Sequence, residues 1–200
     1  MKTAGVLALQ GDFEAHRRAI ERAGGRAIAV RSGAELARCD GLIIPGGEST
    51  TMLKLLAEEG MTAALGEFAE RKPVYGSCAG AILLAREVTN PPQPALGLLD
   101  ITVERNAYGR QLDSRVERLP VAGHGGEGGE MEAVFIRAPI IRRVGSGVQV
   151  LAAYRGDPVW VESGRHMVTT FHPELTADLR VHRRFLAKLQ DPSNHLLTGR

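Results

Sequence analysis

The first half of the chain alternates short apolar segments with amphipathic ones, and this order strongly limits the folds open to it. Apolar segments typical of buried strands lie at 5–10, 26–30, 41–47 and 73–76, and helical patterns lie at 12–24, 49–60 and 61–72. Strands with few polar residues are typical of a parallel sheet that is covered on both faces. The order therefore predicts an α/β three-layer sandwich with a mostly parallel, open sheet and helices on both faces.

The second half has a different pattern. Short strand-like segments are separated by turns, and a final helical pattern follows them; the segments are 98–105, 131–139, 148–154, 158–163, 165–174 and the helix 176–190. We expect a few antiparallel strands to extend the parallel core. The chain has 200 residues, is 44% hydrophobic and shows no boundary or repeat, so a single domain over residues 1–200 is expected.

Composition excludes several classes of function. A net charge of +2 and an aromatic content of 4% give no support for nucleic-acid binding. No apolar run reaches the roughly 18 residues that a membrane helix needs. The two cysteines, Cys39 and Cys78, are too few for a disulfide framework or a typical zinc site. The sequence therefore predicts a metal-free protein of the reducing cytoplasm.

Residues 123–130, GHGGEGGE, are rich in glycine. A phosphate-binding loop follows a strand and opens a helix, and this segment does neither. It is predicted to be a surface loop.

Cys78 lies between an apolar strand and a helix-forming stretch, Ala81 to Arg86. The pattern Gly76-x-Cys78-x-Gly80 has the spacing of a nucleophile elbow, in which a tight turn presents the nucleophile and the neighbours must be small. The N-terminus of the following helix favours thiolate over thiol. The alternative for Cys78 is a small buried apolar residue, and a structural role of this kind is the prediction for Cys39.

A thiol nucleophile needs a base, and His172-Pro173-Glu174 supplies a candidate with an orienting carboxylate. The residue before proline favours an extended backbone, and residues i and i+2 of an extended segment point to the same side. Glu174 is therefore expected to hold one imidazole nitrogen of His172, leaving the other for the thiol proton. The remaining histidines are predicted to be surface or structural residues: His16, His124, His166, His182 and His195.

A third element is IIPGGEST, residues 43–50, which again ends a strand in a glycine turn before a helix. The backbone N–H groups of Gly47 and Ala79 are candidates for an oxyanion hole, with Glu48 and Ser49 beside them. Taken alone, the segment also fits an ordinary turn between strand and helix.

Together and in this order, PGGEST, GSCAGA and FHPE resemble the motifs of the class I, triad-type glutamine amidotransferases. Three further stretches, GVLALQGDFEAH, VERNAYGRQLDS (103–114) and VFIRAP (134–139), resemble the glutaminase subunits of pyridoxal 5′-phosphate synthase, and the similarity spans nearly the whole chain. The resemblance implies Cys78 as nucleophile, with His172 and Glu174 completing a triad. It also implies an L-glutamine site at Gly47, Glu48, Ser49, Arg105, Ile136 and Arg137.

The resemblance implies hydrolysis of L-glutamine to L-glutamate and ammonia without a cofactor or metal. It further implies that the partner is a separate synthase subunit, in a ring-shaped hetero-oligomer that receives the ammonia for vitamin B6 synthesis. Residue chemistry agrees, because the fork of Arg105 suits the α-carboxylate of glutamine, although a surface charge is the alternative for this arginine.

Two other functions remain open from the residues alone. One is the glutaminase subunit of another synthase, such as the imidazole glycerol phosphate type, and the stretch 103–114 discriminates against it. The other is a cysteine redox sensor or chaperone of the same architecture, which needs the elbow but no His-Pro-Glu segment beside it.

Overall fold

The computed structural model describes residues 1–107, 114–122 and 129–191. Residues 108–113 of the stretch 103–114 and residues 123–128 of the glycine-rich segment lie outside these ranges, as do His124 and His195. Within them, a nine-stranded sheet with the order β2-β1-β3-β4-β12-β11-β10-β7-β8 forms the middle of the molecule.

The first five strands in this order are parallel and the last four are antiparallel. The parallel strands are β2 (Arg26–Val30), β1 (Thr3–Leu7), β3 (Gly41–Ile44), β4 (Val74–Ser77) and β12 (His166–Thr169). The antiparallel extension consists of β11 (Asp157–Ser163), β10 (Gln149–Tyr154), β7 (Ser114–Val121) and β8 (Gly129–Ile136). The predicted parallel core with added antiparallel strands is confirmed.

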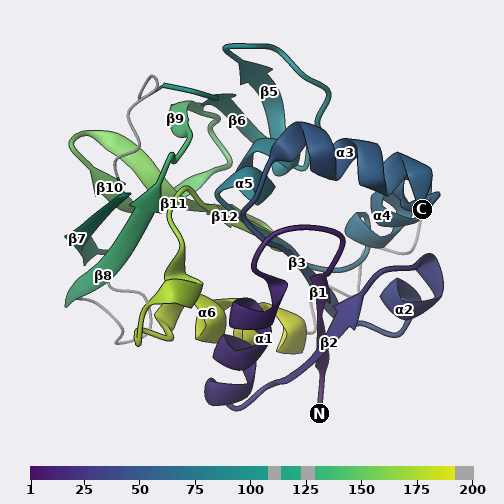
Figure 1. Cartoon of the computed structure of the whole chain (residues 1–200). Helices are drawn as coiled ribbons and strands as arrows, with labels where there is room; N and C mark the ends of the chain where they lie inside the picture. Colours follow the sequence, from purple (N-terminus) through teal and green to yellow (C-terminus); the bar gives the residue numbers. More distant parts are fainter. Residues whose placement is uncertain (108–113, 123–128, 192–200) are drawn as a thin grey trace.

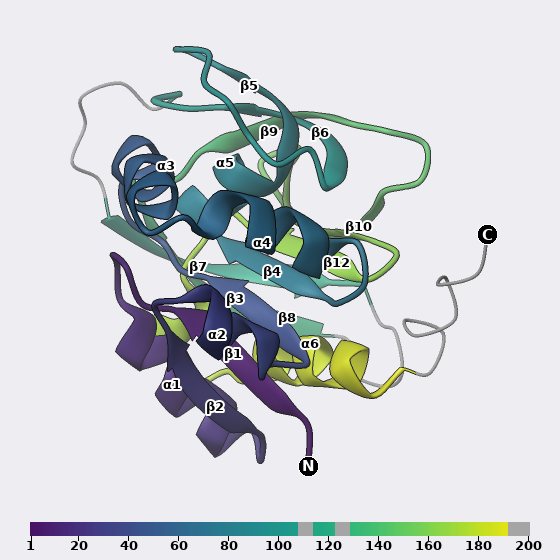
Figure 2. The ribbon, with the colours of Figure 1, turned by 90° about the vertical axis from the view of Figure 1, so that its right-hand side faces the viewer.

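Helices cover both faces of the sheet, as Figures 1 and 2 show. One face carries α1 (Phe13–Arg22) and α6 (Arg180–Gln190), and the other carries α2 (Gly33–Ala37), α3 (Ser49–Glu58), α4 (Met61–Ala69) and α5 (Ala79–Leu84). Side chains alternate along a strand, so β3 sends Leu42 and Ile44 into one hydrophobic cluster and Ile43 into the other. The three-layer α/β architecture is thus confirmed.

A second, three-stranded sheet, β5-β6-β9, packs on the α5 side of the large sheet. Its strands are β5 (Ala85–Thr89), β6 (Leu99–Glu104) and β9 (Ile140–Val144). The sequence pattern did not predict β5, β7, β9 or α2. The predicted helix 81–86 was also displaced, because α5 begins at Ala79 and the chain turns into β5 at Ala85.

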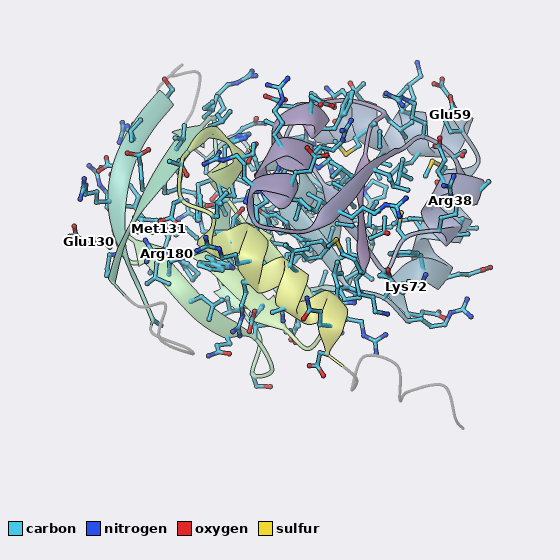
Figure 3. All side chains as sticks on the ribbon, turned by 90° about the horizontal axis from the view of Figure 1, so that it is seen from below. Arg38, Glu59, Lys72, Glu130, Met131 and Arg180 are labelled. Carbon is cyan, nitrogen blue, oxygen red and sulfur yellow. The ribbon has the colours of Figure 1, made fainter. Side chains whose placement is uncertain are left out.

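Arginine side chains of α6 bind this helix to the antiparallel strands. Arg180 donates a hydrogen bond to the backbone carbonyl of Glu130 on β8 (Figure 3), and Arg184 donates to Glu162 on β11 at 3.1 Å. These contacts hold α6 against β8 and β11.

In the part of the chain that the structure describes, none of the helices combines the length and the apolar character needed to cross a membrane.

Candidate active site

Cys78 occupies the turn between β4 and α5, with φ 49° and ψ −104°. Residues other than glycine rarely adopt a positive φ, and backbone strain of this kind is concentrated at functional sites. A Cβ at Gly76 would lie 2.4 Å from the carbonyl of Gly80, and one at Gly80 would lie 2.2 Å from the oxygen of Ile44. Both glycines are therefore required by close backbone packing, as the elbow pattern predicts.

The fold brings His172 to this turn because β4 and β12 are neighbours. Ser77 pairs with Thr169 across the two strands, and the backbone N–H of Cys78 donates to the carbonyl of Thr169 at 2.8 Å. Three residues beyond Thr169 the chain reaches His172, whose own N–H donates to Val134 of β8 at 2.8 Å. The carboxyl ends of two adjacent parallel strands thus carry the thiol and the imidazole.

His172 and Glu174 form a close pair, with Nδ1 and Oε1 2.7 Å apart. The predicted extended link between them is wrong: β12 ends at Thr169, and Pro173–Leu175 form a 3₁₀ turn, η1. The turn still directs the buried carboxylate to the imidazole. Since Nδ1 is held by Glu174, Nε2 is the nitrogen left for the thiol.

The charges of this pair follow from its partners. Burial opposes a charged imidazole, but hydrogen bonds and charge attraction from Cys78 and Glu174 outweigh it and raise the pKa of His172 to about 10. Burial likewise opposes the carboxylate, but its neighbours His16 and His172 outweigh it and lower the pKa of Glu174 to about 2. At neutral pH the arrangement favours an imidazolium beside the sulfur, which is the state that supports a thiolate.

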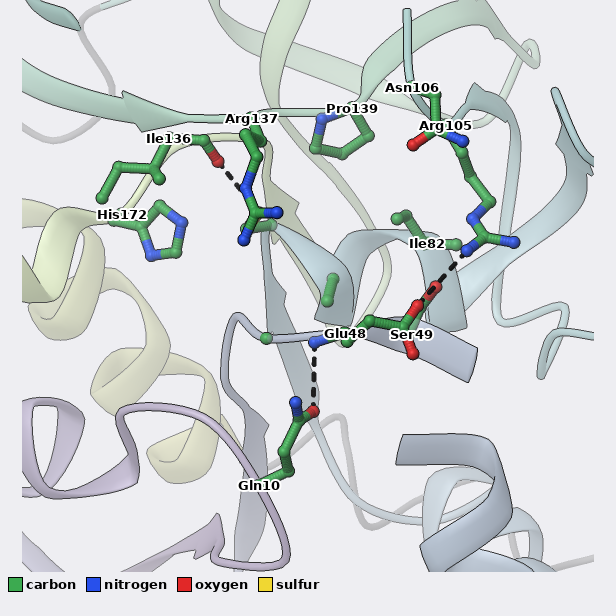
Figure 4. A pocket seen from close by; sticks show the side chains of 13 residues that line it. Gln10, Glu48, Ser49, Ile82, Arg105, Asn106, Ile136, Arg137, Pro139 and His172 are labelled. Carbon is green, nitrogen blue, oxygen red and sulfur yellow. Dashed lines mark hydrogen bonds and ion pairs between the residues drawn. The ribbon is translucent and has the colours of Figure 1, made fainter. Parts of the chain in front are cut away.

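A pocket of about 330 Å³ opens over Cys78, which is within the usual size of small-molecule sites. Its lining includes all the site residues that the sequence predicts except Glu174, namely Gly47, Glu48, Ser49, Cys78, Ala79, Arg105, Ile136, Arg137 and His172. Glu174 lies behind His172, with 7% of its surface exposed. Figure 4 shows the labelled side chains around the cavity, with Arg105 and Glu48 on one side of it and His172 on the other.

Glu48 has two roles in the structure. It caps α3, because its carboxylate accepts hydrogen bonds from the backbone N–H groups of Thr50 at 3.2 Å and Thr51 at 2.6 Å. Glu48, and not Ser49 or one of the threonines, is therefore the N-cap residue of α3. Burial opposes the charge of Glu48, but the hydrogen bonds from Thr51 and Thr50 lower its pKa to about 2. It therefore presents a permanent negative charge at the pocket.

Arg105 follows β6 and extends into the pocket from the second sheet. Its Nη2 lies 3.4 Å from Glu48 Oε1 and donates to Thr50 Oγ1 at 3.1 Å, and only 13% of its side chain is exposed. A free surface charge does not fit this placement. Arg105 and Glu48 consequently place a cation and an anion side by side in the pocket, which matches the two charges of an α-amino acid.

Two backbone loops meet at the floor of the pocket. Gln10 Oε1 accepts a hydrogen bond from the backbone N–H of Glu48 at 3.1 Å (Figure 4), and a Cβ at Gly11 would lie 1.9 Å from the oxygen of Gly46. A Cβ at Gly46 would in turn lie 2.4 Å from His172 Cε1. The glycine pair 46–47 is thus enclosed between the loop after β1 and the imidazole.

Ile136 and Arg137 lie opposite the elbow. Ile136 is the last residue of β8, and its carbonyl oxygen is 3.9 Å from the sulfur of Cys78. Arg137, predicted to lie on the strand, is instead the first residue beyond it and has φ 45°. The main chain at this turn therefore faces the sulfur of Cys78.

Some residues of the site were missed by the sequence analysis. Gln10, Ile82, Asn106 and Pro139 line the pocket, and His16 Nε2 lies 3.2 Å from Glu174 Oε2 behind it. A signal for His16 was present, because it lies at helical spacing with the apolar Phe13 and Ile20. A histidine on a buried helix face needs a polar partner.

The second cysteine is remote from this chemistry. Cys39 donates a weak hydrogen bond to the carbonyl of Glu35 at 3.4 Å, and burial raises the pKa of its thiol to about 11. The structural role that the sequence predicts for Cys39 fits these surroundings. Among residues 1–107, 114–122 and 129–191, no three His, Cys, Asp or Glu side chains form a group that suits a metal ion.

Comparison with known proteins agrees with this geometry. A curated relative from Solibacter usitatus, named pyridoxal 5′-phosphate synthase subunit PdxT, is 59% identical over 94% of this chain and 100% of its own length. A relative of the same name from Deinococcus radiodurans is 52% identical over 92% of this chain and 95% of its own. A crystal structure described as a glutamine amidotransferase superposes with a TM-score of 0.86 and 47% identity, covering 94% of this chain and 99% of that one.

More distant structures share the fold. A structure described as PurLQS from Thermotoga maritima has a TM-score of 0.66 at 17% identity, and the match covers 95% of this chain and 98% of that one. The model of the SNO glutamine amidotransferase family matches residues 6–191. The chain therefore belongs to the SNO glutamine amidotransferase family.

Proposed function

We propose that this chain is the glutaminase subunit of a pyridoxal 5′-phosphate synthase and hydrolyses L-glutamine to L-glutamate and ammonia. The observation that carries the proposal is the strained Cys78, with His172 as its hydrogen-bond partner, at the floor of a pocket that also holds Glu48 and Arg105. The names of the curated relatives support the choice of synthase.

In the first half of the reaction, the Cys78 sulfur attacks the side-chain amide carbon of glutamine. The carbonyl oxygen becomes an oxyanion, for which the N–H groups of Gly47 and Ala79 are the proposed donors. His172 gives its proton to the departing nitrogen, so that ammonia leaves and a thioester remains on Cys78.

In the second half, the now neutral imidazole of His172 takes a proton from water. The hydroxide attacks the thioester carbon, the carbon–sulfur bond breaks, and L-glutamate leaves. Glu174 holds Nδ1 of His172 throughout, so that Nε2 remains the nitrogen that exchanges protons. The cycle needs no metal or organic cofactor.

We assign recognition of L-glutamine to side chains that bind its α-carboxylate and its α-ammonium group. Arg105 pairs with the α-carboxylate and Glu48 with the α-ammonium, while Ser49 and the main chain at Ile136 and Arg137 complete the site. The surroundings of the charged pair support this, because the resting Arg105–Glu48 contact of 3.4 Å is open to exchange for the charges of a ligand.

Three wider assignments belong to the same proposal. Residues 1–200 act as a single glutamine amidotransferase domain, and the reactive thiol works in the reducing cytoplasm. The acceptor of the ammonia is a separate synthase subunit in a ring-shaped hetero-oligomer, since release into water would lose the ammonia. The word "subunit" in the relatives' names supports a multi-chain assembly.

The decisive experiment combines the purified chain with the synthase subunit, supplies L-glutamine, and measures glutamate and ammonia together. Equal amounts of the two products, and a covalent adduct on Cys78 in the intact mass after acid quenching, are expected. Release of neither product by the assembled proteins contradicts the proposal.

A further inference from the structure

On the buried side of the active site, Glu174 contacts further polar side chains that the reaction above does not use. Glu174 Oε1 bonds to His172, but its other oxygen, Oε2, lies 3.2 Å from Nε2 of His16 on α1. The side chain of His16 is completely buried and that of Glu174 is 1% exposed. His16 therefore contacts the carboxylate that orients the proposed base, without reaching the pocket itself.

His16 also contacts the elbow and helix α6. Its Nε2 lies 2.9 Å from Oγ of Ser77, the residue before Cys78, and its Nδ1 lies 3.1 Å from Nε2 of His182. Helices α1 and α6 lie side by side on the same face of the sheet, which brings the two histidines together (Figures 1 and 2). One imidazole thus joins Glu174, Ser77 and the neighbouring helix.

The contacts of His182 decide which ring nitrogens of His182 and His16 carry protons. His182 Nδ1 is buried without a hydrogen-bond partner among the described residues, so it is the nitrogen that carries no proton, because a buried N–H left unpaired is costly. His182 therefore donates from Nε2 to Nδ1 of His16. The proton of His16 must then lie on Nε2, which faces Ser77 and Glu174.

The opposite tautomer of His16, with the proton on Nδ1, is unfavourable because of Glu174. If Nε2 of His16 carried a lone pair, it would face the negative oxygen of Glu174 at 3.2 Å. Burial lowers the pKa values of His16 and His182, the latter to about 3, so both imidazoles are neutral at pH 7. His16 consequently offers Glu174 an N–H dipole and not a competing positive charge.

Oxygen Oε2 of Glu174 depends on this contact. It is buried and has no hydrogen-bond partner in the described part of the chain, and His16 Nε2, which lies 3.2 Å away, is hydrogen-bonded to Ser77 Oγ. A buried anionic oxygen that loses its nearest donor is strongly destabilised. Removal of the His16 N–H is therefore expected to disturb the carboxylate and, through it, the imidazolium of His172.

We propose that His16, oriented by His182, is a positioning residue of the glutaminase reaction that holds the free oxygen of Glu174 and thereby the His172–Cys78 pair. This inference rests on the proposed function for its consequence in catalysis, but its effect on the thiol is independent of glutamine. It also explains why two histidines occupy apolar helix faces.

The groups that face His16 define what a pH experiment reports. They come from α6, β4, the loop before α1 and η1 with its preceding residue: His182, Tyr75, Asp12, Glu174 and His172. Tyr75 is buried and its pKa is raised by burial, so it does not titrate below pH 9. His182 stays neutral and His172 stays charged between pH 5 and 8, so the alkylation profile over this range compares the reactivity of Cys78 among the variants.

The test compares His16→Gln, whose side-chain amide places an N–H near the position of Nε2, with His16→Met, which has no donor. His166→Gln is the matched control, because His166 is a half-buried histidine on β12 that accepts from the N–H of Val74 at 3.2 Å and does not touch the site. For each protein we would measure kcat and KM for glutamine, the thermal melt, and the rate at which iodoacetamide alkylates Cys78 between pH 5 and 8. Cys39, mapped by mass spectrometry, serves as the internal slow thiol.

His16→Met should lower kcat roughly tenfold or more, the scale seen for outer partners of catalytic ligands in metal enzymes, with KM changed less than about twofold. Its Cys78 alkylation at pH 6 to 7 should slow in parallel, while His16→Gln recovers most of both rates and His166→Gln resembles wild type. Equal kcat and equal alkylation profiles for folded Met and Gln variants overturn the proposal. A loss of kcat in His16→Met with an unchanged alkylation profile also overturns it, because that result indicates a purely structural role.

Two further comparisons keep the test decisive. If His16→Met does not fold, His182→Met and His182→Gln replace it, and only the Met variant should slow alkylation; equal profiles overturn the inference. If the wild-type protein assembled with the synthase subunit does not hydrolyse glutamine, the proposed function fails, whereas the alkylation profiles of the His16 variants still support or refute the positioning role.

Discussion

Cys78 and Cys39 are both buried thiols, but their surroundings predict opposite results when each is replaced by alanine. Cys78→Ala should abolish glutamine hydrolysis and leave the fold intact, because a small side chain fits the turn between Gly76 and Gly80. Cys39→Ala should retain most activity, since its thiol is buried in a hydrophobic cluster, donates to the carbonyl of Glu35 and does not line the pocket. Steady-state glutamate release and thermal melts of both variants check this, and substantial hydrolysis by the Cys78 variant contradicts the mechanism.

Arg105 provides a second prediction at a single residue. Arg105→Ala should raise KM for glutamine roughly 10- to 150-fold, because a charge-assisted contact contributes about 1.5 to 3 kcal/mol in both ground and transition states. The change in kcat should be small. Arg105→Lys keeps the charge but not the fork and should lie between the two proteins. An unchanged KM in initial-rate measurements would return Arg105 to the role of a surface charge.

Residues whose role depends on local backbone chemistry were predictable, and residues that depend on packing were not. The elbow at Cys78 follows from Gly76 and Gly80, and both are required by contacts within a few residues or with the adjacent strand. The contact between His16 and His182 joins residues 166 positions apart on two helices. No local pattern indicates that α1 and α6 place these histidines against each other.

At the scale of elements, the strands that escaped prediction are those with mixed polarity. In β5 the side chains of Arg86 and Glu87 are exposed, and β7 alternates exposed and half-buried residues over most of its length. Each is specified by its neighbour in a sheet, and pairing between distant segments is not encoded in a local period. The buried parallel strands were predictable because both of their faces are apolar.

Helices α1 and α6 and strand β12 carry histidines that make the fold sensitive to acid. Burial lowers the pKa values of His16, His182 and His166, the last to about 4, so these groups are neutral when folded but take up protons near pH 6.5 when unfolded. The unfolded state then binds more protons, and stability is present above pH 6.5 and is lost as the pH falls. Each histidine should contribute a loss approaching about 1.4 kcal/mol per pH unit below 6.5.

Urea unfolding at pH 7.0, 6.0 and 5.0 measures this effect. His172 does not offset it, because its raised pKa leaves it protonated in both states below pH 6.5; its contribution is lost only as the pH rises toward 10. His166→Gln should reduce the slope of stability against pH by about one proton. A free energy of unfolding that is constant from pH 7 to 5 contradicts the prediction.

At the scale of the whole molecule, the sheet divides the protein into two hydrophobic clusters, and the site lies where they meet at the carboxyl edge of β4 and β12. The pocket draws its lining from the loop after β1, the turn after β3, the elbow, the end of β8 and the second sheet. A change in any one of these segments therefore reaches the others through direct contact. This arrangement suits a site whose geometry responds to a partner.

The coupling between two of these loops leads to a prediction about the synthase subunit. Gln10 holds the N–H of Glu48 at 3.1 Å, and Gly11 and Gly46 are in backbone contact, so displacement of residues 10–11 must also move the glycine pair 46–47. Gly47 is a proposed oxyanion donor, and a donor out of position costs about 10²- to 10³-fold in kcat. A partner that docks on this edge of the sheet can therefore switch the reaction on by moving the N–H of Gly47 into the oxyanion site.

The purified chain should accordingly show low glutaminase activity alone and clear stimulation by the synthase subunit, measured as glutamate release at saturating glutamine. Gln10→Ala, which removes the contact with Glu48 but no reacting group, should bind the subunit yet change the degree of stimulation. Lys54→Ala is the control, because Lys54 is exposed on α3 and pairs only with Glu58 at 3.7 Å in the described structure. Full activity of the chain alone, unchanged by a subunit shown to bind, would mean that the oxyanion site is already complete and that docking serves delivery of ammonia without gating its release.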